Sequence, residues 1–208
     1  MIYEFRTYTL APRTQPEFLK RFGEALPKRL EMSRLAAFWT TEIGPLNQVI
    51  HVWEYKDINE RAKTREAAVK AGVWPPKLSE FIVGMKSEIL IPQPFSPPMA
   101  PSNHGPYFEM RTYQLKAGGT PQMSEGWAKH IAGRTKLSPL IGCFTSDLGQ
   151  LNNWVHIWAY KSLDERVAIR KKAMDAGIWP PPSTPDKPSP TVMQETRILL
   201  AAPFSPIK

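Results

Sequence analysis

Two short polar segments that could do chemistry each occur twice in the sequence. The first reads "EFRTYTL" at residues 4–10 and "EMRTYQL" at residues 109–115, and the second reads "HVWEY" at residues 51–55 and "HIWAY" at residues 156–160. Because every second side chain of an extended strand points the same way, each segment gathers its polar and aromatic residues on one face. The candidate ligand-binding residues on these faces are Glu4, Arg6, Tyr8, His51, Trp53, Tyr55, Glu109, Arg111, Tyr113, His156, Trp158 and Tyr160.

These residue types support two interpretations. A buried histidine beside an arginine and a glutamate has a shifted pKa and can act as a general base or acid. An arginine beside a tyrosine can hold a carboxylate or an enolate oxygen. The alternative is a structural polar core, in which Glu4 pairs with Arg6 and His51 bonds to a tyrosine or to the backbone. The sequence names no catalytic residue, so both interpretations stay open.

Other residues give weaker signals. His51 and His156 lie outside HxH, HxxxH and carboxylate clusters, so we predict no metal site and no cofactor, with haem ligation as a minor alternative. The second predicted helix of each copy carries a pair of arginines at i, i+4, which form an anion-binding edge, a solvated face, or a pair that caps neighbouring carbonyls. These pairs are Arg61 with Arg65 and Arg166 with Arg170.

A tandem repeat positions these residues. Aligned with itself at an offset of 105 residues, the chain matches without a gap from Glu4 to Pro76, and about a third of the paired positions are identical. The second copy then gains four residues within "PPSTPDKPSP", and the match resumes at the two "PFSP" motifs. The sequence therefore predicts two domains, residues 1–98 and 106–208, joined by a Pro-rich linker at residues 99–105.

Each copy has the order β-α-β-β-α-β of a ferredoxin-like unit in an α+β protein. A first helix is predicted over residues 16–35 from apolar residues at helical spacing. A second helix opens with a capping-box spacing at Asp57 or Ser162 and ends at Gly72 or Gly177, just before a Trp-Pro-Pro sequence. Strands are predicted from alternation and aromatic or β-branched residues at residues 3–10, 36–43, 48–55 and 81–91 and at the matching positions of the second copy.

A ferredoxin-like sheet has helices on one face only, so its other face must be covered or polar. Ile50 and Val52 are aliphatic and are predicted to face the helices, which leaves His51, Trp53 and Tyr55 on the opposite side. Because such large rings are costly to leave in water, the two sheets should pack against each other. The expected architecture is an intramolecular pseudo-dimeric α/β barrel with this polar-aromatic face inside.

Composition excludes several classes of protein. No stretch approaches the roughly 20 apolar residues of a membrane-spanning helix, and strand-like sequence stands where a signal peptide would. Cys143 is the only cysteine, so no intrachain disulfide forms. The net charge of +8 comes from basic residues interspersed with acidic ones, without a nucleic-acid-binding motif. We expect a cytoplasmic protein that binds neither membranes nor nucleic acid.

The strand "YEFRTYTL", the run "HVWEYKDINER" and the Trp region that follows are similar to the NIPSNAP family, once in each half of the chain. That family belongs to the dimeric α/β-barrel superfamily, so the resemblance implies the same barrel. The superfamily includes haem-binding oxygenases, cofactor-free monooxygenases, chlorite dismutases and muconolactone isomerases, and the family itself has no firmly assigned reaction. Its eukaryotic members are associated with mitochondria, and the absence of a leader favours a bacterial cytoplasmic protein.

The predicted function is binding of a small aromatic or carboxylated molecule in a cavity between the two sheets, with an oxygenase-like or isomerase-like reaction as its enzymatic form. The alternative is a non-catalytic interaction or scaffold module with a satisfied polar core. Assembly into a homo-oligomer is compatible with both.

Overall fold

The computed structural model describes residues 1–208, which form a closed barrel of eight antiparallel strands with four helices outside it. The first half contains β1 (Ile2–Leu10), α1 (Gln15–Leu30), β2 (Leu35–Ile43), β3 (Gln48–Tyr55), α2 (Ile58–Lys70), the short 3₁₀ helix η1 (Ser79–Phe81) and β4 (Ile82–Pro92). The second half contains β5 (Tyr107–Leu115), α3 (Thr120–Thr135), β6 (Leu140–Leu148), β7 (Asn153–Tyr160), α4 (Leu163–Asp175) and β8 (Thr191–Ala201). Two successive β-α-β-β-α-β units are therefore confirmed.

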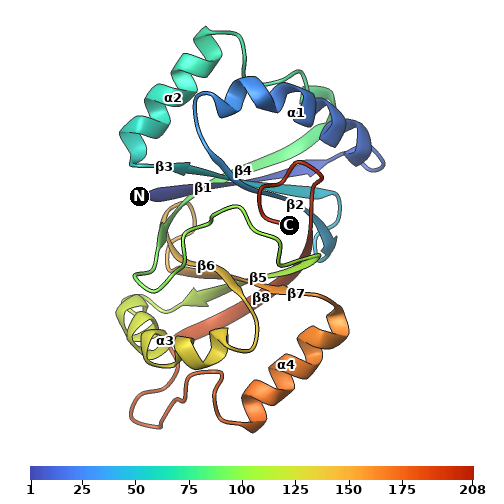
Figure 1. Ribbon diagram of the computed structural model, residues 1–208. Helices are drawn as coiled ribbons and strands as arrows, with labels where there is room; N and C mark the ends of the chain where they lie inside the picture. Colours follow the sequence, from blue (N-terminus) through green and yellow to red (C-terminus); the bar gives the residue numbers. More distant parts are fainter.

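The two halves close one barrel, whose strand order is β1-β3-β2-β8-β5-β7-β6-β4. The halves meet where β2 pairs with β8 and β4 pairs with β6, so no strand edge is left open. Helices α1 and α2 cover the sheet of the first half, and α3 and α4 cover the sheet of the second half on the opposite side (Figure 1). None of these helices combines the length and the hydropathy needed to cross a bilayer.

The repeated helix signals are confirmed. Asp57 and Ser162 are the N-caps of α2 and α4, and their side chains accept hydrogen bonds of 2.9–3.0 Å from backbone N–H groups of the first turn. Gly72 and Gly177 follow the helix ends with φ angles of +67° and +63°, a conformation that glycine adopts without strain. The peptide bonds Trp74–Pro75 and Trp179–Pro180 are cis, which the sequence pattern did not indicate.

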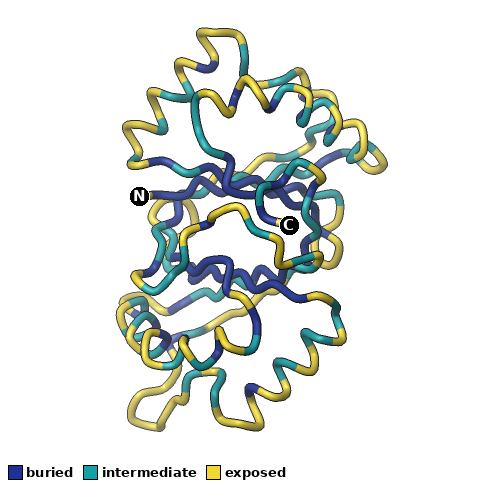
Figure 2. The backbone as a smooth tube through the Cα atoms, viewed as in Figure 1, coloured by how far each residue is buried: buried dark blue, intermediate teal, exposed yellow.

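The barrel interior is apolar, and the predicted orientation of the strand faces is wrong. The strands that form the barrel wall are largely buried (Figure 2). Tyr3, Phe5, Ile50 and Val52 point inward and belong to one hydrophobic cluster shared by both halves. The face that we expected inside lies on the outer side of the sheets, beneath the helices of its own half. Its members include Glu4, Arg6, Tyr8, His51, Trp53 and Tyr55 and their counterparts in the second half.

The helices explain this reversal. The prediction assumed that they offer the sheet an apolar surface, but α2 buries only Ala68 and presents Arg61 and Arg65 to the sheet. A buried carboxylate needs such cationic partners. The residues that pack between the two sheets, away from the open end of the barrel, are apolar and offer no cation. The aliphatic faces therefore pack together in the interior. Helix α1 also ends at Leu30 rather than at residue 35, because the chain must extend into β2.

The two ends of the barrel differ. At one end Met99 of the linker and Ile207 of the C-terminal segment join the interior cluster, and each is only 1% exposed. At the other end the barrel opens into a cavity of about 310 Å³. A cavity between the sheets therefore exists, but none of the twelve residues predicted to bind a ligand lines it.

Candidate functional site

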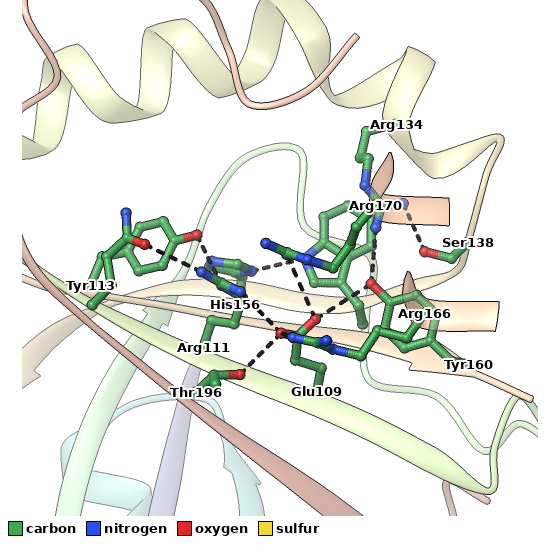
Figure 3. Close-up of polar contacts among 12 residues, drawn as sticks. Glu109, Arg111, Tyr113, Arg134, Ser138, His156, Tyr160, Arg166, Arg170 and Thr196 are labelled. Atoms are coloured by element: carbon green, nitrogen blue, oxygen red, sulfur yellow. Dashed lines mark hydrogen bonds and ion pairs between the residues drawn. The ribbon is translucent and has the colours of Figure 1, made fainter. Parts of the chain in front are cut away.

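Glu109 on β5 lies at the centre of a buried ion-pair cluster (Figure 3). Its Oε1 atom accepts hydrogen bonds from Arg111 Nη1 at 3.0 Å, from Arg166 Nη2 at 2.5 Å and from Thr196 Oγ1 at 3.0 Å, and Arg170 Nη1 lies 4.0 Å from Oε2. Burial alone would raise the pKa of Glu109, but the arginines, Arg166 foremost, outweigh burial and lower the pKa to about 2. With three arginines around one carboxylate, the cluster has a surplus of positive charge.

The elements that build this cluster are set by spacing along the chain. Arg166 and Arg170 lie one turn apart on α4, so both reach the same carboxylate. The first half repeats the arrangement around Glu4, which is fully buried. Its Oε1 atom accepts from three side chains, Arg6 at 2.7 Å, Arg61 at 2.6 Å and Ser87 at 2.8 Å. Its pKa is also about 2, because Arg61 and Arg6 outweigh the effect of burial.

His156 on β7 is buried beside this cluster and is neutral. Its Nδ1 atom accepts a hydrogen bond of 2.8 Å from Trp158 Nε1, so the proton resides on Nε2, which has no partner. Burial, followed by the charge of Arg111, lowers the pKa of His156 well below its usual value. The rings of Tyr113 and Trp127 enclose the imidazole, with centroids 4.8 and 4.7 Å away.

His51 in the first half has the same environment. Its Nδ1 atom accepts from Trp53 Nε1 at 2.7 Å, and Nε2 is again without a partner. Burial is the main cause of a pKa lowered to about 3, and the charge of Arg6 adds to it. The histidines therefore bond to neither of the partners predicted for a structural core, a tyrosine or the backbone, but to the tryptophan two residues along the same strand.

Two buried arginines that we did not identify from the sequence complete the clusters. Arg134 at the end of α3 donates to Ser138 Oγ at 2.7 Å and to Tyr160 Oη at 3.0 Å, and its guanidinium lies 4.1 Å from the ring centroid of Trp158. Arg29 on α1 occupies the equivalent place in the first half. A signal was present, because among the sixteen aligned positions of α1 and α3 only the first proline and this arginine are identical.

A cavity of about 410 Å³ lies next to the Glu109 cluster, between α3, the loop after α4 and the outer face of the sheet. Tyr113, Trp127 and Trp179 form aromatic parts of its lining. The cavity meets the cluster at Tyr113 and Gln194, whose oxygens accept hydrogen bonds from Arg111 at 3.0 and 3.3 Å. The loop that closes the cavity, residues 179–191, contains the four residues that only the second copy has.

The predicted site residues are thus brought together within each half, but not in one place. Helices α2 and α4 lie on opposite outer sides of the barrel (Figure 1), and the Glu4 and Glu109 clusters lie beneath them, because Arg61 of α2 and Arg166 of α4 bind these glutamates. Of the twelve residues, only Tyr113 lines the cavity beneath α3. The paired arginines of α2 and α4 are neither an open anion-binding edge nor a solvated face, because they contact the buried glutamates.

Comparisons with known proteins agree with this architecture. The NIPSNAP family model matches residues 3–97 and 108–206. The chain is 32% identical over 182 residues to a NipSnap homolog of Dictyostelium discoideum, covering 86% of this chain and 78% of that protein. It is 30% identical over 217 residues to human NipSnap homolog 3A, covering 100% of this chain and 86% of that protein.

Two solved structures are similar in fold alone. One is a Fusobacterium nucleatum protein described provisionally as a monooxygenase, with a TM-score of 0.65, 11% identity and coverage of 97% of this chain and 92% of that one. The other is an anthrone oxidase-like protein, with a TM-score of 0.60, 8% identity and coverage of 96% and 90%. These two structures agree with the barrel fold, and the family match in both halves shows that the chain belongs to the NIPSNAP family, as a tandem pair of its domains.

Proposed function

We propose that the second half of the protein binds a small aromatic carboxylate in the cavity beneath α3. The observation that carries the proposal is that an aromatic wall meets a cluster with surplus positive charge. The ring centroids of Trp127 and Trp179 are 4.5 Å apart, and the two ring planes make an angle of 83°. A flat ligand can therefore stack on one ring and contact the edge of the other. A volume of about 410 Å³ is typical of a site for one small molecule.

The polar end of the ligand would lie against Tyr113. The hydroxyl of Tyr113 accepts its hydrogen bond from Arg111 Nε, so its own proton remains to be donated to a ligand oxygen. Arg170 does not line the cavity, but it is 35% exposed and lies 4.0 Å from Glu109, so it adds to the positive charge of the cluster that the cavity meets. Arg111 and Arg166 are instead bound closely to the glutamate.

We propose that the cavity binds the carboxylate. That it also carries out an oxygenase-like or isomerase-like reaction on this ligand is a further expectation. His156 is neutral and is enclosed by Tyr113 and Trp127, so it does not reach a ligand in this cavity. Tyr113 is the cluster residue placed to donate a hydrogen bond to a carboxylate or an enolate oxygen. In such a reaction it would stabilise negative charge on the ligand.

Tryptophan fluorescence and thermal shift with benzoate, phenylacetate and naphthoate test this function. We expect quenching and a raised unfolding temperature with the carboxylates, and weaker effects with benzyl alcohol. Tyr113→Phe should weaken carboxylate binding by about tenfold, the loss of a hydrogen bond to a charged group. Tyr8→Phe is the matched control, because Tyr8 accepts from Arg6 in the same way but lines neither cavity. Equal affinity in both variants, or no response to any carboxylate, would contradict the proposal.

A second candidate function is a non-catalytic scaffold module, which is favoured by the closely paired Glu4 and Glu109 clusters of both halves. Carboxylate binding separates the two functions, because a scaffold module should bind none of the carboxylate probes. His51→Asn and His156→Asn should lower stability under both functions and leave carboxylate affinity unchanged, since neither histidine lines the cavity.

A further inference from the structure

The cavity of about 310 Å³ at the open end of the barrel is separate from the cavity beneath α3. Its inner part is apolar, with Phe5 and Ile50 from the first half and Met110 and Val155 from the second. Nearer the opening, the same strands supply hydroxyl and amide groups. These polar lining residues are Thr7, Thr9, Gln48, Thr112, Gln114 and Asn153.

Two opposite charges occupy equivalent places on opposite walls of this cavity. Glu88 on β4 pairs in register with Phe5, and Arg197 on β8 pairs in register with Met110. In the closed strand order, β4 and β8 are four strands apart in a ring of eight and therefore face each other. A symmetric homodimer must carry the same residue at both positions. The duplicated chain carries an acid at one and a base at the other.

Both charged side chains are held in place by hairpin turns. A Cβ atom on Gly149, between β6 and β7, would lie 3.0 Å from Glu88 Cγ, and one on Gly44, between β2 and β3, would lie 3.3 Å from Arg197 Cγ. Arg197 Nη1 also donates to Gln48 Oε1 at 2.9 Å. The two side chains are consequently only 15% and 21% exposed.

Glu88 and Arg197 pair not with each other but with more exposed neighbours on their own strands, Lys86 and Glu195, which also line the cavity. Lys86 Nζ lies 3.0 Å from Glu88, and Glu195 lies 4.0 Å from Arg197. These neighbours are 54% and 63% exposed, so water screens both pairs and either can separate at little cost. The acid on one wall and the base on the other therefore remain available to a ligand.

We propose that the open end of the barrel binds a small zwitterion that has an apolar body between its two charges. The ammonium would lie at Glu88, the carboxylate at Arg197, and the body against Phe5 and Met110. Opposite charges on opposite walls select a molecule that is charged at both ends, and an apolar inner surface favours hydrocarbon between them. An ω-amino acid and a short apolar peptide both have this chemistry.

Calorimetric titration of the intact chain compares ε-aminocaproate and valylvaline with caproate and hexylamine, which each carry one charge. The zwitterions should bind at least about tenfold more tightly than either singly charged probe. The tighter of the two zwitterions shows whether the site takes an ω-amino acid or a peptide. In NMR spectra of the wild-type protein the zwitterion should shift the methyl signal of Met110 and not that of Met123, which lines the other cavity.

Exchange of the two charges gives the sharpest test. Glu88→Gln and Arg197→Gln should each reduce zwitterion affinity to that of a singly charged probe. The double variant Glu88→Arg/Arg197→Glu, made together with Lys86→Glu/Glu195→Lys so that each new charge keeps an opposite neighbour, should recover affinity to within about threefold, because the ligand can bind reversed across the pseudo-two-fold axis. Tyr113→Phe serves as the control and should leave this affinity unchanged. Equal binding of all four probes, no binding at millimolar concentration, or a folded double variant that does not recover affinity would each overturn the proposal.

Discussion

Glu4 and Glu109 show what a buried carboxylate requires. Removing such a charge from water costs several kcal/mol, and arginines repay this cost only in close, hydrogen-bonded geometry. Each glutamate has two close arginines and a third about 4 Å away. In the first half Glu4 Oε2 still lacks a partner. The clusters are therefore sensitive to any change that unbalances their charges.

Glu109→Gln should lower the free energy of unfolding by roughly 3–5 kcal/mol, because the amide leaves Arg111 and Arg166 without a negative partner. Urea denaturation followed by circular dichroism measures the change. Glu80→Gln is the control, since Glu80 is 61% exposed in its pair with Arg21 and should matter little. A loss for Glu109→Gln no larger than that for Glu80→Gln would show that the buried cluster does not stabilise the fold.

At the scale of single residues, much of the candidate site is predictable from the sequence. Side chains alternate between the two faces of a strand, and this alternation alone places Glu109, Arg111 and Tyr113 on one face. Alternation does not say which face turns inward. That depends on what the helices offer, and the decisive residues, Arg134 and Arg166, lie far from the strand in sequence. The cavity beneath α3 could not be predicted, because its wall is an irregular loop without a periodic signal.

At the scale of elements, that loop distinguishes the two halves. Residues 179–191 close the cavity beneath α3 with a Pro-rich segment longer by four residues than its counterpart after α2. The inserted part is exposed, and its only backbone pairing is a single β-bridge between Thr184 and Lys187. An exposed insertion of this kind contributes little to stability, so its role can be tested by removing it.

Deletion of residues 183–186 should reduce the affinity for benzoate or naphthoate by about tenfold or more, because part of the cavity wall is lost. The unfolding temperature should change little, since these residues are exposed. Binding of ε-aminocaproate at the barrel end provides an internal control and should persist. If aromatic carboxylates bind the shortened chain as well as the full chain, the cavity is not their site.

At the scale of the whole molecule, the fold follows from the repeat. An ungapped match fixes two equal units, each unit has one uncovered sheet face, and pairing those faces within one chain gives the barrel. The same reasoning holds with either face inside, which is why the architecture was predicted correctly while the orientation of the strand faces was not. In the structure the aliphatic residues Ile50 and Val155 meet in the interior, and His51 and His156 lie outside it.

This placement has a consequence for the pH dependence of stability. His51 and His156 are neutral in the folded protein because burial, and then nearby arginines, lower their pKa values, that of His51 to about 3. In the unfolded chain each histidine titrates near pH 6.5. Below that pH the unfolded chain binds more protons than the folded one, so stability falls as the pH falls, by about 1.4 kcal/mol per pH unit for each histidine. Glu4 and Glu109, with pKa values lowered to about 2, add to the loss below about pH 4.5.

The unfolding free energy, measured by urea denaturation across a pH series, should therefore be nearly flat above about pH 7 and decline from about pH 6 downward. His156→Asn removes one of the two groups and should roughly halve the slope between about pH 6 and pH 5, whatever its effect on stability at neutral pH. A stability that stays constant down to about pH 5 would mean that the buried imidazoles take up protons in the folded state, in conflict with their apolar and arginine-rich surroundings.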